Sequence, residues 1–239
     1  MPDIVLETSG LSRHFGGVMA LDNVDFSLRA RELRCLIGPN GAGKSTFFNC
    51  LTGLIRPSEG HIFMRGDETT GWPVHRIASL GVGIKTQVPS VMDGLTVREN
   101  IWLAARRHHR RCDDAELRTD EIVDRLSIGS MSHRILAHLA HGERQQVELG
   151  LVMTGDPWLV LLDEPAAGMS SEDMVRIGEI LREINDTAAM IIVEHDMQFV
   201  RSIASRITVF HQGRVLVEDD VECVMSDPTV RDVYLGRTA

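Results

Sequence analysis

Paired cysteines are absent from this sequence, as are linkers and repeats. The four cysteines are Cys35, Cys50, Cys112 and Cys223. Because no two of them form a Cys-x-x-Cys pair, their spacing argues against a zinc ribbon or a disulfide framework and fits a reducing compartment. No low-complexity tract, internal repeat or Pro/Gly/Ser-rich linker divides the chain. Its 239 residues, 43% of them hydrophobic, suffice for one substantial core, so we expect a single domain over residues 1–239.

Long apolar runs and an excess of positive charge are also missing. Purely apolar runs such as Trp158 to Leu162 are far too short to cross a bilayer, and no basic region followed by an apolar stretch opens the chain. We therefore expect a cytoplasmic protein that works at a membrane only through another subunit. The net charge of −9 disfavours nucleic acid as a partner, because such binding depends on neutralising phosphates.

One basic run, Arg106 to Arg111, stands apart from this acidic balance. It follows a segment that begins with the capping-box sequence Thr96-Val97-Arg98-Glu99, so it falls near the end of an expected helix. Cations are favoured at a helix C-terminus, and we expect a solvated helix end. Contact with anionic lipid or nucleic acid is the alternative.

The most informative stretch that is present is a complete phosphate loop. It consists of Gly38, Pro39, Asn40, Gly41, Ala42, Gly43, Lys44, Ser45 and Thr46. A strand-like segment, 32–37, precedes it and a helical segment, 45–54, follows, which is the context that this motif requires. Backbone N–H groups and the helix start would bind phosphates, Lys44 would reach the β- and γ-oxygens, and the Ser45 hydroxyl would ligate Mg²⁺. A glycine turn that binds nothing would leave Lys44 without a partner at a helix end that disfavours cations.

Polar side chains follow three other strand-like segments. An apolar segment ends in Asp163 and Glu164, which is the arrangement in which the first acid reaches Mg²⁺ and the second polarises the attacking water. A solvated acidic turn is the alternative. His195 would contact the γ-phosphate and Gln87 would sense both Mg²⁺ and the γ-phosphate, although a lone histidine or glutamine is often structural.

Hydrophobic periodicity predicts the fold class. Strand-like segments lie at residues 23–29, 32–37, 61–65, 81–85, 159–163, 189–193 and 206–210. They alternate with helical segments such as 170–185, while the segment 96–155 contains only helical patterns. The first strand alternates with period two, which is typical of an antiparallel strand. We therefore predict an α/β phosphate-loop NTPase core with a mostly parallel sheet, an N-terminal antiparallel β portion and a helical subdomain inserted at about residues 89–157.

Over nearly its whole length the chain resembles the nucleotide-binding subunit of ATP-binding cassette transporters. The phosphate loop, Gln87, a helical segment, the stretch Leu139–Glu143, the Asp163–Glu164 pair and His195 follow the family's order and spacing. The resemblance implies an ATPase that binds ATP and Mg²⁺ across a head-to-tail dimer with a second cassette subunit. It also implies membrane permease subunits, indirectly a solute-binding protein, and a place on the cytoplasmic face of the inner membrane.

The same resemblance assigns two further nucleotide contacts. Phe15 stands where the family places an aromatic that stacks on adenine, with a core Phe as the alternative. The family's short glycine motif, usually Leu-Ser-Gly-Gly-Gln, contacts the γ-phosphate held by the opposite subunit. Here its last four positions are Ala140, His141, Gly142 and Glu143, which lack the serine hydroxyl and add an acid. Recognition would then depend on Gly142, the helix-start N–H groups and His141.

Family members that import branched-chain amino acids or urea are similar in this variant glycine motif. The stretches 36–44, 193–200 and 233–237 together resemble importers of urea or short-chain amides most, with importers of branched-chain amino acids as the alternative. Two other classes are less favoured. A non-transport cassette ATPase of DNA repair or translation usually carries a coiled-coil insertion or two cassettes, and this chain has no sustained heptads. A phosphate-loop kinase would need neither the glycine motif nor Glu164 aligned with water.

Replacement of Lys44 by alanine tests the phosphate loop. Lys44→Ala removes a charge-assisted contact and is expected to weaken nucleotide binding by about 1.5–3 kcal/mol or more, because hydrogen bonds to charged groups contribute about that much. The fold should survive. Calorimetric titration with MgATP measures the change, and an unchanged affinity in the folded variant would contradict the assignment.

Overall fold

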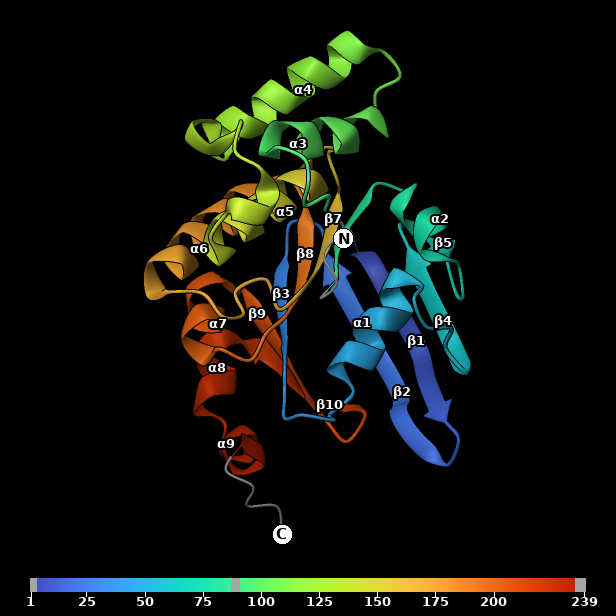
Figure 1. Ribbon diagram of the computed structural model, residues 1–239. Coiled ribbons are helices and arrows are strands. Elements are labelled where there is room, and N and C mark those ends of the chain that lie inside the picture. Colours follow the sequence, from blue (N-terminus) through green and yellow to red (C-terminus); the bar gives the residue numbers. More distant parts are fainter. Residues whose placement is uncertain (1–3, 87–90, 235–239) are drawn as a thin grey trace.

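The computed structural model describes residues 4–86 and 91–234 and contains two sheets with helices packed between and around them (Figure 1). The strands are β1 (Ile4–Phe15), β2 (Val18–Arg29), β3 (Leu33–Ile37), β4 (Glu59–Met64), β5 (Asp67–Glu68), β6 (Val82–Lys85), β7 (Leu159–Asp163), β8 (Ala189–Val193), β9 (Arg206–His211) and β10 (Arg214–Asp220). The helices are α1 (Lys44–Thr52), α2 (Val74–Ala78), α3 (Val97–Arg106), α4 (Cys112–Arg125), α5 (His141–Met153), α6 (Ser171–Asn185), α7 (Met197–Ile203), α8 (Val221–Ser226) and α9 (Pro228–Tyr234). Within the described ranges no helix is long and apolar enough to cross a membrane.

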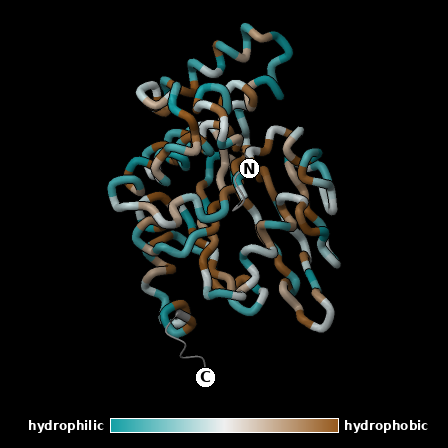
Figure 2. The backbone as a smooth tube through the Cα atoms, in the orientation of Figure 1, coloured by the Kyte–Doolittle hydropathy of each residue, from teal (hydrophilic) through white to brown (hydrophobic). Residues whose placement is uncertain are grey.

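The larger sheet has six strands in the order β10-β9-β3-β8-β7-β6 and is mostly parallel, as predicted. Pairing is parallel from β9 through β3, β8 and β7 to β6, and only β10 runs antiparallel to its neighbour β9. Every residue of β3, β7 and β8 is buried. Such continuous apolar strands are typical of a parallel sheet covered on both faces, and Figure 2 shows brown, hydrophobic segments running through the middle of the molecule.

The smaller sheet is antiparallel and has the order β2-β1-β4-β5. The predicted strand at 23–29 belongs to it as the second half of β2, and the predicted strand at 61–65 pairs here with β1. Helix α1 lies between the two sheets. The ring of Phe47 is 5.3 Å from that of Phe26 in β2 and 5.2 Å from that of Phe210 in β9, so one aromatic contact joins both sheets to the helix that follows the phosphate loop.

Helices α3, α4 and α5 form a helical region at the top of Figure 1. The predicted capping box starts α3, because Thr96 Oγ1 accepts from the Glu99 N–H at 3.2 Å and Glu99 Oε2 accepts from the Thr96 N–H at 2.7 Å. Helix α3 ends at Arg106, so the basic run begins at a helix end as expected. Its residues Arg107, Arg110 and Arg111 are exposed.

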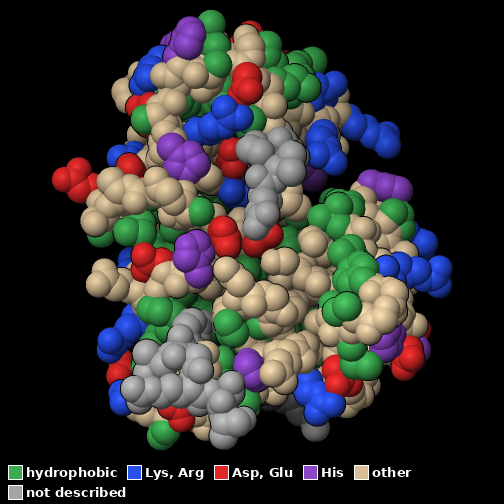
Figure 3. Space-filling view, turned by 60° about the horizontal axis from the view of Figure 1, so that its bottom comes forward, with side chains coloured by type: hydrophobic (Ala, Val, Ile, Leu, Met, Phe, Trp, Pro, Cys, Tyr) green, Lys and Arg blue, Asp and Glu red, His purple; other side chains and the backbone are tan. Residues whose placement is uncertain are grey.

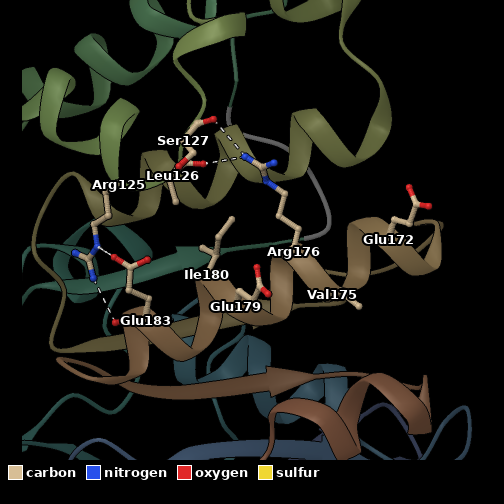
Figure 4. A pocket seen from close by; sticks show the side chains of 9 residues that line it. All are labelled: Arg125, Leu126, Ser127, Glu172, Val175, Arg176, Glu179, Ile180 and Glu183. Atoms are coloured by element: carbon tan, nitrogen blue, oxygen red, sulfur yellow. Dashed lines mark hydrogen bonds and ion pairs between the residues drawn. The ribbon is translucent and has the colours of Figure 1, made fainter.

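The helical region is attached to α6 along a groove of about 470 Å³ (Figure 4). Arg176 donates to the carbonyl oxygens of Leu126 and Ser127 at 3.2 and 3.3 Å, which are carbonyls just beyond the last turn of α4. Beside it, Arg125 pairs with Glu183 at 2.5 Å. None of the predicted nucleotide-site residues that the structure describes lines this groove.

Helix α5 covers β6 through a close contact at Gly83. A Cβ atom at Gly83 would lie 2.5 Å from Val152 Cγ1, so the missing side chain lets the helix approach the strand. A second contact joins the same two elements. Glu148, one helical turn before Val152, forms an ion pair with Lys85, two residues after Gly83. Moving back along the helix from Val152 to Glu148 corresponds to moving forward along the strand from Gly83 to Lys85, so helix and strand run antiparallel. The two contacts match in spacing, because four helical residues rise about 6 Å and two strand residues about 6.6 Å. The N-terminus of α5 therefore lies toward the carboxyl edge of the sheet.

The contact at Gly83 gives a test of this packing. Gly83→Ala forces Val152 to move and is expected to lower the free energy of unfolding by about 1–3 kcal/mol, the usual cost of overpacking. In the double variant with Val152→Ala the clash is gone, so the two effects should not add. Urea denaturation measures both, and additive losses would show that α5 does not pack on β6 at this point.

Candidate functional site

The parallel order of the strands brings the predicted site residues to one edge of the larger sheet. In register, Leu36 of β3 and Asp163 of β7 both lie opposite Val193 of β8, and Lys85 of β6 lies opposite Leu162. The chain leaves each strand at this carboxyl edge, which is where ligands of open α/β sheets bind. Figure 3 shows acidic and histidine side chains gathered near the middle of one face of the molecule.

The phosphate loop has the backbone that its glycines predict. Gly43, with φ 106°, directly precedes α1, and a Cβ atom there would lie 2.7 Å from the carbonyl oxygen of Ala20, so a larger residue does not fit. Ala42 accepts a hydrogen bond from the Gly213 N–H at 2.9 Å, which ties the loop to the turn between β9 and β10. Lys44 folds back over the loop and donates to the carbonyl oxygens of Gly38 and Pro39 at 2.6 and 3.0 Å.

Burial opposes the charged forms of two groups in this site. The pKa of Lys44 is lowered by burial, against the raising effect of Glu164 and Asp163. The pKa of Asp163 is raised to about 6, first by burial and then by the neighbouring charge of Glu164, while Lys85 and Lys44 lower it. The charged forms of Lys44 and Asp163 are therefore less favourable here than in water, and a ligand that carries opposite charges would reduce this free-energy cost.

The donors around Asp163 fit Mg²⁺ bound together with phosphates. Asp163 is 6% exposed, and its Oδ1 is buried without a hydrogen-bond partner in the part of the chain that the structure describes. Ser45, in the first turn of α1, is exposed. Across residues 4–86 and 91–234 no group of three or more His, Cys, Asp or Glu side chains could hold a metal ion by itself. Mg²⁺ commonly uses one or two carboxylates plus substrate phosphates, so a carboxylate with a free buried oxygen and the exposed hydroxyl of Ser45 suit it.

Glu164 has an unusual backbone and a histidine neighbour. Its φ is +46°, a left-handed conformation that costs roughly 1–3 kcal/mol in a non-glycine residue and often marks a functional site. Its N–H donates to the carbonyl oxygen of Val193 at 2.9 Å, which fixes this turn to the end of β8. The Nδ1 atom of His195 lies 3.4 Å from Glu164 Oε1, so the predicted base and the predicted γ-phosphate contact are side by side.

Sequence reasoning missed a third acid, Glu194, which holds this turn together. Glu194 is 1% exposed and accepts from the Ala166 N–H at 3.0 Å and from the His195 N–H at 3.1 Å. Burial raises its pKa, against these two hydrogen bonds. The signal was available, because Glu194 follows a buried apolar strand just as Asp163 ends one.

The short glycine motif begins α5, and its two polar variant residues have partners within the chain. Glu143 accepts from the Ala140 N–H at 2.9 Å, which caps the helix, and pairs with Arg134 at 2.8 Å. His141 Nε2 donates to the carbonyl oxygen of Ala167 at 2.8 Å. The two polar departures from the usual motif, His141 and Glu143, therefore have partners within the chain.

A side chain at Gly142 would have to displace the carboxylate of Asp173 in its own subunit. A Cβ atom there would lie 2.5–2.7 Å from the carboxylate of Asp173 on α6. That carboxylate accepts from Ser170 Oγ at 2.7 Å, while Ser170 caps α6 through the Asp173 N–H at 3.2 Å. The first turns of α5 and α6 are thus packed against each other at the glycine.

Two predicted residues remain, Phe15 and Gln87. Phe15, at the end of β1, is 44% exposed, and the Arg13 guanidinium carbon lies 4.6 Å from its ring centroid. The alternative of a core phenylalanine is therefore wrong. Phe15 pairs with Val18 across the hairpin, two residues before Ala20, whose carbonyl oxygen borders Gly43. Gln87 lies outside the described residues.

A phosphate loop at the head of α1, with acids at the ends of neighbouring parallel strands, defines a phosphate-loop nucleoside triphosphatase. The sequence profile described as ABC transporter matches residues 21–167, and the chain belongs to this family. It is 34% identical over 253 residues to the high-affinity branched-chain amino acid transport ATP-binding protein LivG of Salmonella typhimurium, covering 99% of each chain. It is 32% identical to BraF of Pseudomonas aeruginosa, described in the same words, covering 97% of this chain and 98% of that one.

Solved structures agree with the assignment. The ADP conformation of MJ1267, an ATP-binding cassette of an ABC transporter, superposes with a TM-score of 0.88 at 25% identity over 98% of this chain and 99% of that one. The dimeric post-hydrolysis state of the cassette MJ0796, bound to ADP and Pi, gives 0.80 at 22% identity over 90% and 98%, and shows the same fold. The chain is a nucleotide-binding ATPase of the ABC transporter family.

The raised pKa of Asp163 predicts how stability depends on pH in the nucleotide-free protein. The pKa of Asp163 is about 6 in the folded chain, against an ordinary value of 3.8, so the folded chain binds this proton more tightly than the unfolded chain does. The stability that this difference contributes is present at low pH and is lost as pH rises through about 6. Asp163→Asn removes the buried charge and should raise the free energy of unfolding by about 2–3 kcal/mol near pH 7.5, a gain that should vanish near pH 4.

Urea denaturation in the presence of a chelator, repeated across this pH range, measures the difference between variant and wild type. A difference that stays constant with pH, or an asparagine variant that is less stable at neutral pH, would contradict the buried charge.

Proposed function

We propose that this chain is the ATP-hydrolysing subunit of a membrane importer for branched-chain amino acids. The observation that carries the reaction is the meeting of Glu164, His195 and Asp163 beside the phosphate loop. The solute class follows from LivG and BraF, which match almost end to end. These relatives favour branched-chain amino acids over urea or short-chain amides, the class that the sequence alone placed first.

The proposed residue roles follow from the geometry. Residues 38–46 hold the phosphates through backbone N–H groups, and Lys44 turns from the loop carbonyls to the β- and γ-oxygens. Ser45 and Asp163 hold Mg²⁺, which when bound neutralises the phosphate charge. Glu164 polarises the attacking water, and His195 contacts the γ-phosphate from a position fixed by Glu194.

Three further roles belong to the same proposal. Phe15 stacks on adenine with its exposed ring, and Gln87 senses Mg²⁺ and the γ-phosphate. The N-terminus of α5, residues 140–143, contacts the γ-phosphate of ATP held by a second cassette subunit. The carboxylate of Glu143 already caps the helix and pairs with Arg134, which lowers its repulsion of a phosphate.

The proposal also includes the assembly in which the chain works. The chain forms one cassette over residues 1–239, with a helical subdomain at about 89–157, and dimerises head to tail with an identical or homologous cassette. It attaches to permease subunits on the cytoplasmic face of the inner membrane, and the complex works with a solute-binding protein. Closure on ATP and reopening after hydrolysis would move the permease.

Solute-stimulated ATPase activity of the intact complex in vesicles tests this function. Leucine, isoleucine and valine with the binding protein should raise the rate several-fold, and urea should not. A complex with Glu164→Gln should hydrolyse ATP about 10²–10⁴-fold more slowly while still binding ATP, because the amide keeps the shape of the carboxylate but cannot act as a base.

Glu179→Gln, an exposed acid on α6, is the matched control and should keep the wild-type rate. Stimulation by urea or acetamide alone would restore the other solute class. An ATPase rate of Glu164→Gln within about threefold of wild type would remove Glu164 from the role of base.

A further inference from the structure

Four charged side chains form a line from the surface to the interior beside the nucleotide site. Asp93 Oδ1 lies 2.8 Å from Arg144 Nη1, Arg144 Nε lies 3.5 Å from Glu148 Oε1, and Glu148 Oε2 lies 3.2 Å from Lys85 Nζ. The side-chain exposure falls along the line, from 60% at Asp93 and 26% at Arg144 to 5% at Glu148 and 7% at Lys85. We call these four residues the charge chain.

The inner end of the charge chain reaches the acid of the proposed Mg²⁺ site. Lys85 is the last residue of β6 and lies opposite Leu162, so its strand position is one residue before that of Asp163. Its ammonium lowers the pKa of Asp163 against the effect of burial. Lys85 thus carries the positive charge between two acids on different elements, Glu148 on α5 and Asp163 on β7.

The ion pair of Glu148 with Lys85 opposes sliding of α5 along β6, a movement that the apolar contacts between them do not prevent. Val152 packs on Gly83, but apolar contacts are non-directional and tolerate sliding of a helix along a strand. Glu148 meets Lys85 at one axial position only. It lies six residues after Gly142, about 9 Å along the helix, so any slide of α5 would carry its N-terminus with it.

Stability does not require charges in this place. Replacing a buried ion pair by apolar residues of similar volume is often neutral or stabilising, whereas removing one partner leaves an unpaired buried charge. A second buried pair in the same sheet shows the contrast. Arg34 of β3 lies 2.5 Å from Glu32, just before that strand, and 2.5 Å from Glu218 of β10, so these ion pairs connect strands and their neighbours and no helix.

We propose that Glu148 and Lys85 are positioning residues for ATP hydrolysis, which hold the N-terminus of α5 at a fixed height relative to the sheet edge that carries Asp163, with Arg144 and Asp93 extending the pair to the surface. The role of that N-terminus rests on the proposed function. The charge chain itself joins three segments, β6, α5 and the residues before α3, into one unit.

The kinetic test is a double-mutant cycle in the full-length chain. Glu148→Gln should lower the kcat of ATP hydrolysis by about tenfold or more, with monomer affinity for MgATP within about twofold of wild type. Lys85→Met with Glu148→Gln should be no slower than the worse single variant, because the two act as one pair. Arg144→Gln, which is partly exposed and easier to tolerate, should lower kcat by about threefold.

Hydrogen exchange on the nucleotide-free chain gives a readout that needs no turnover. In Glu148→Gln, amides in the first two turns of α5 should exchange about fivefold faster or more, while those of α1 and α6 stay unchanged. Glu32→Gln is the control, because it removes an equally buried acid from an ion pair that touches no helix, while Arg34 keeps Glu218 as a partner. It should change neither α5 exchange nor kcat by more than about twofold.

Unchanged exchange in α5 together with unchanged kcat in Glu148→Gln and Arg144→Gln would overturn the proposal. An equal fall of kcat in Glu32→Gln would do so too, because loss of any buried pair would then suffice. Failure of the proposed function is separate. It would appear as a wild-type complex that no branched-chain amino acid stimulates, while exchange and basal kcat still decide the role of the charge chain.

Discussion

The parallel pairing of β3, β8, β7 and β6 is the constraint on which the site depends. Each of these strands ends at the same edge of the sheet, and each is followed by a polar or phosphate-binding residue. Three carboxylates, Asp163, Glu164 and Glu194, therefore converge with the cations Lys44 and Lys85. No local sequence feature could bring these groups together without the sheet.

This convergence explains why the nucleotide-free site is electrostatically strained. Burial raises the pKa of Asp163 and lowers that of Lys44, so both charged forms are less favourable than in water. Glu164 adds backbone strain at a positive φ, held by a hydrogen bond to β8. A bound ligand with phosphates and a divalent cation would place opposite charges beside Lys44 and Asp163. The free energy that these buried charges cost in the free protein would then contribute to binding.

The variant glycine motif shows how a departure from a family pattern is accommodated. Glu143 uses its extra charge within the chain, as a helix cap and as the partner of Arg134. His141 binds the loop after β7, and Gly142 leaves space for Asp173 of α6. The start of α5 is thus coupled to the rest of the cassette from one side by these contacts and from the other by the charge chain at Lys85.

The sequence by itself determined the phosphate loop, the fully buried strands β7 and β8, the capped start of α3, and the order of motifs that marks the family. These features are encoded in a few neighbouring residues, through periodicity, capping hydrogen bonds and glycine backbone. Tertiary structure decided the rest. Strand β1 escaped prediction because register shifts around Gly10 break its alternation, and β10 because it is rich in charge. The pairing of 61–65 with β1, the role of Glu194 and the contact of Lys85 with Glu148 all depend on distant residues meeting, which only the packing of helices on sheets can specify.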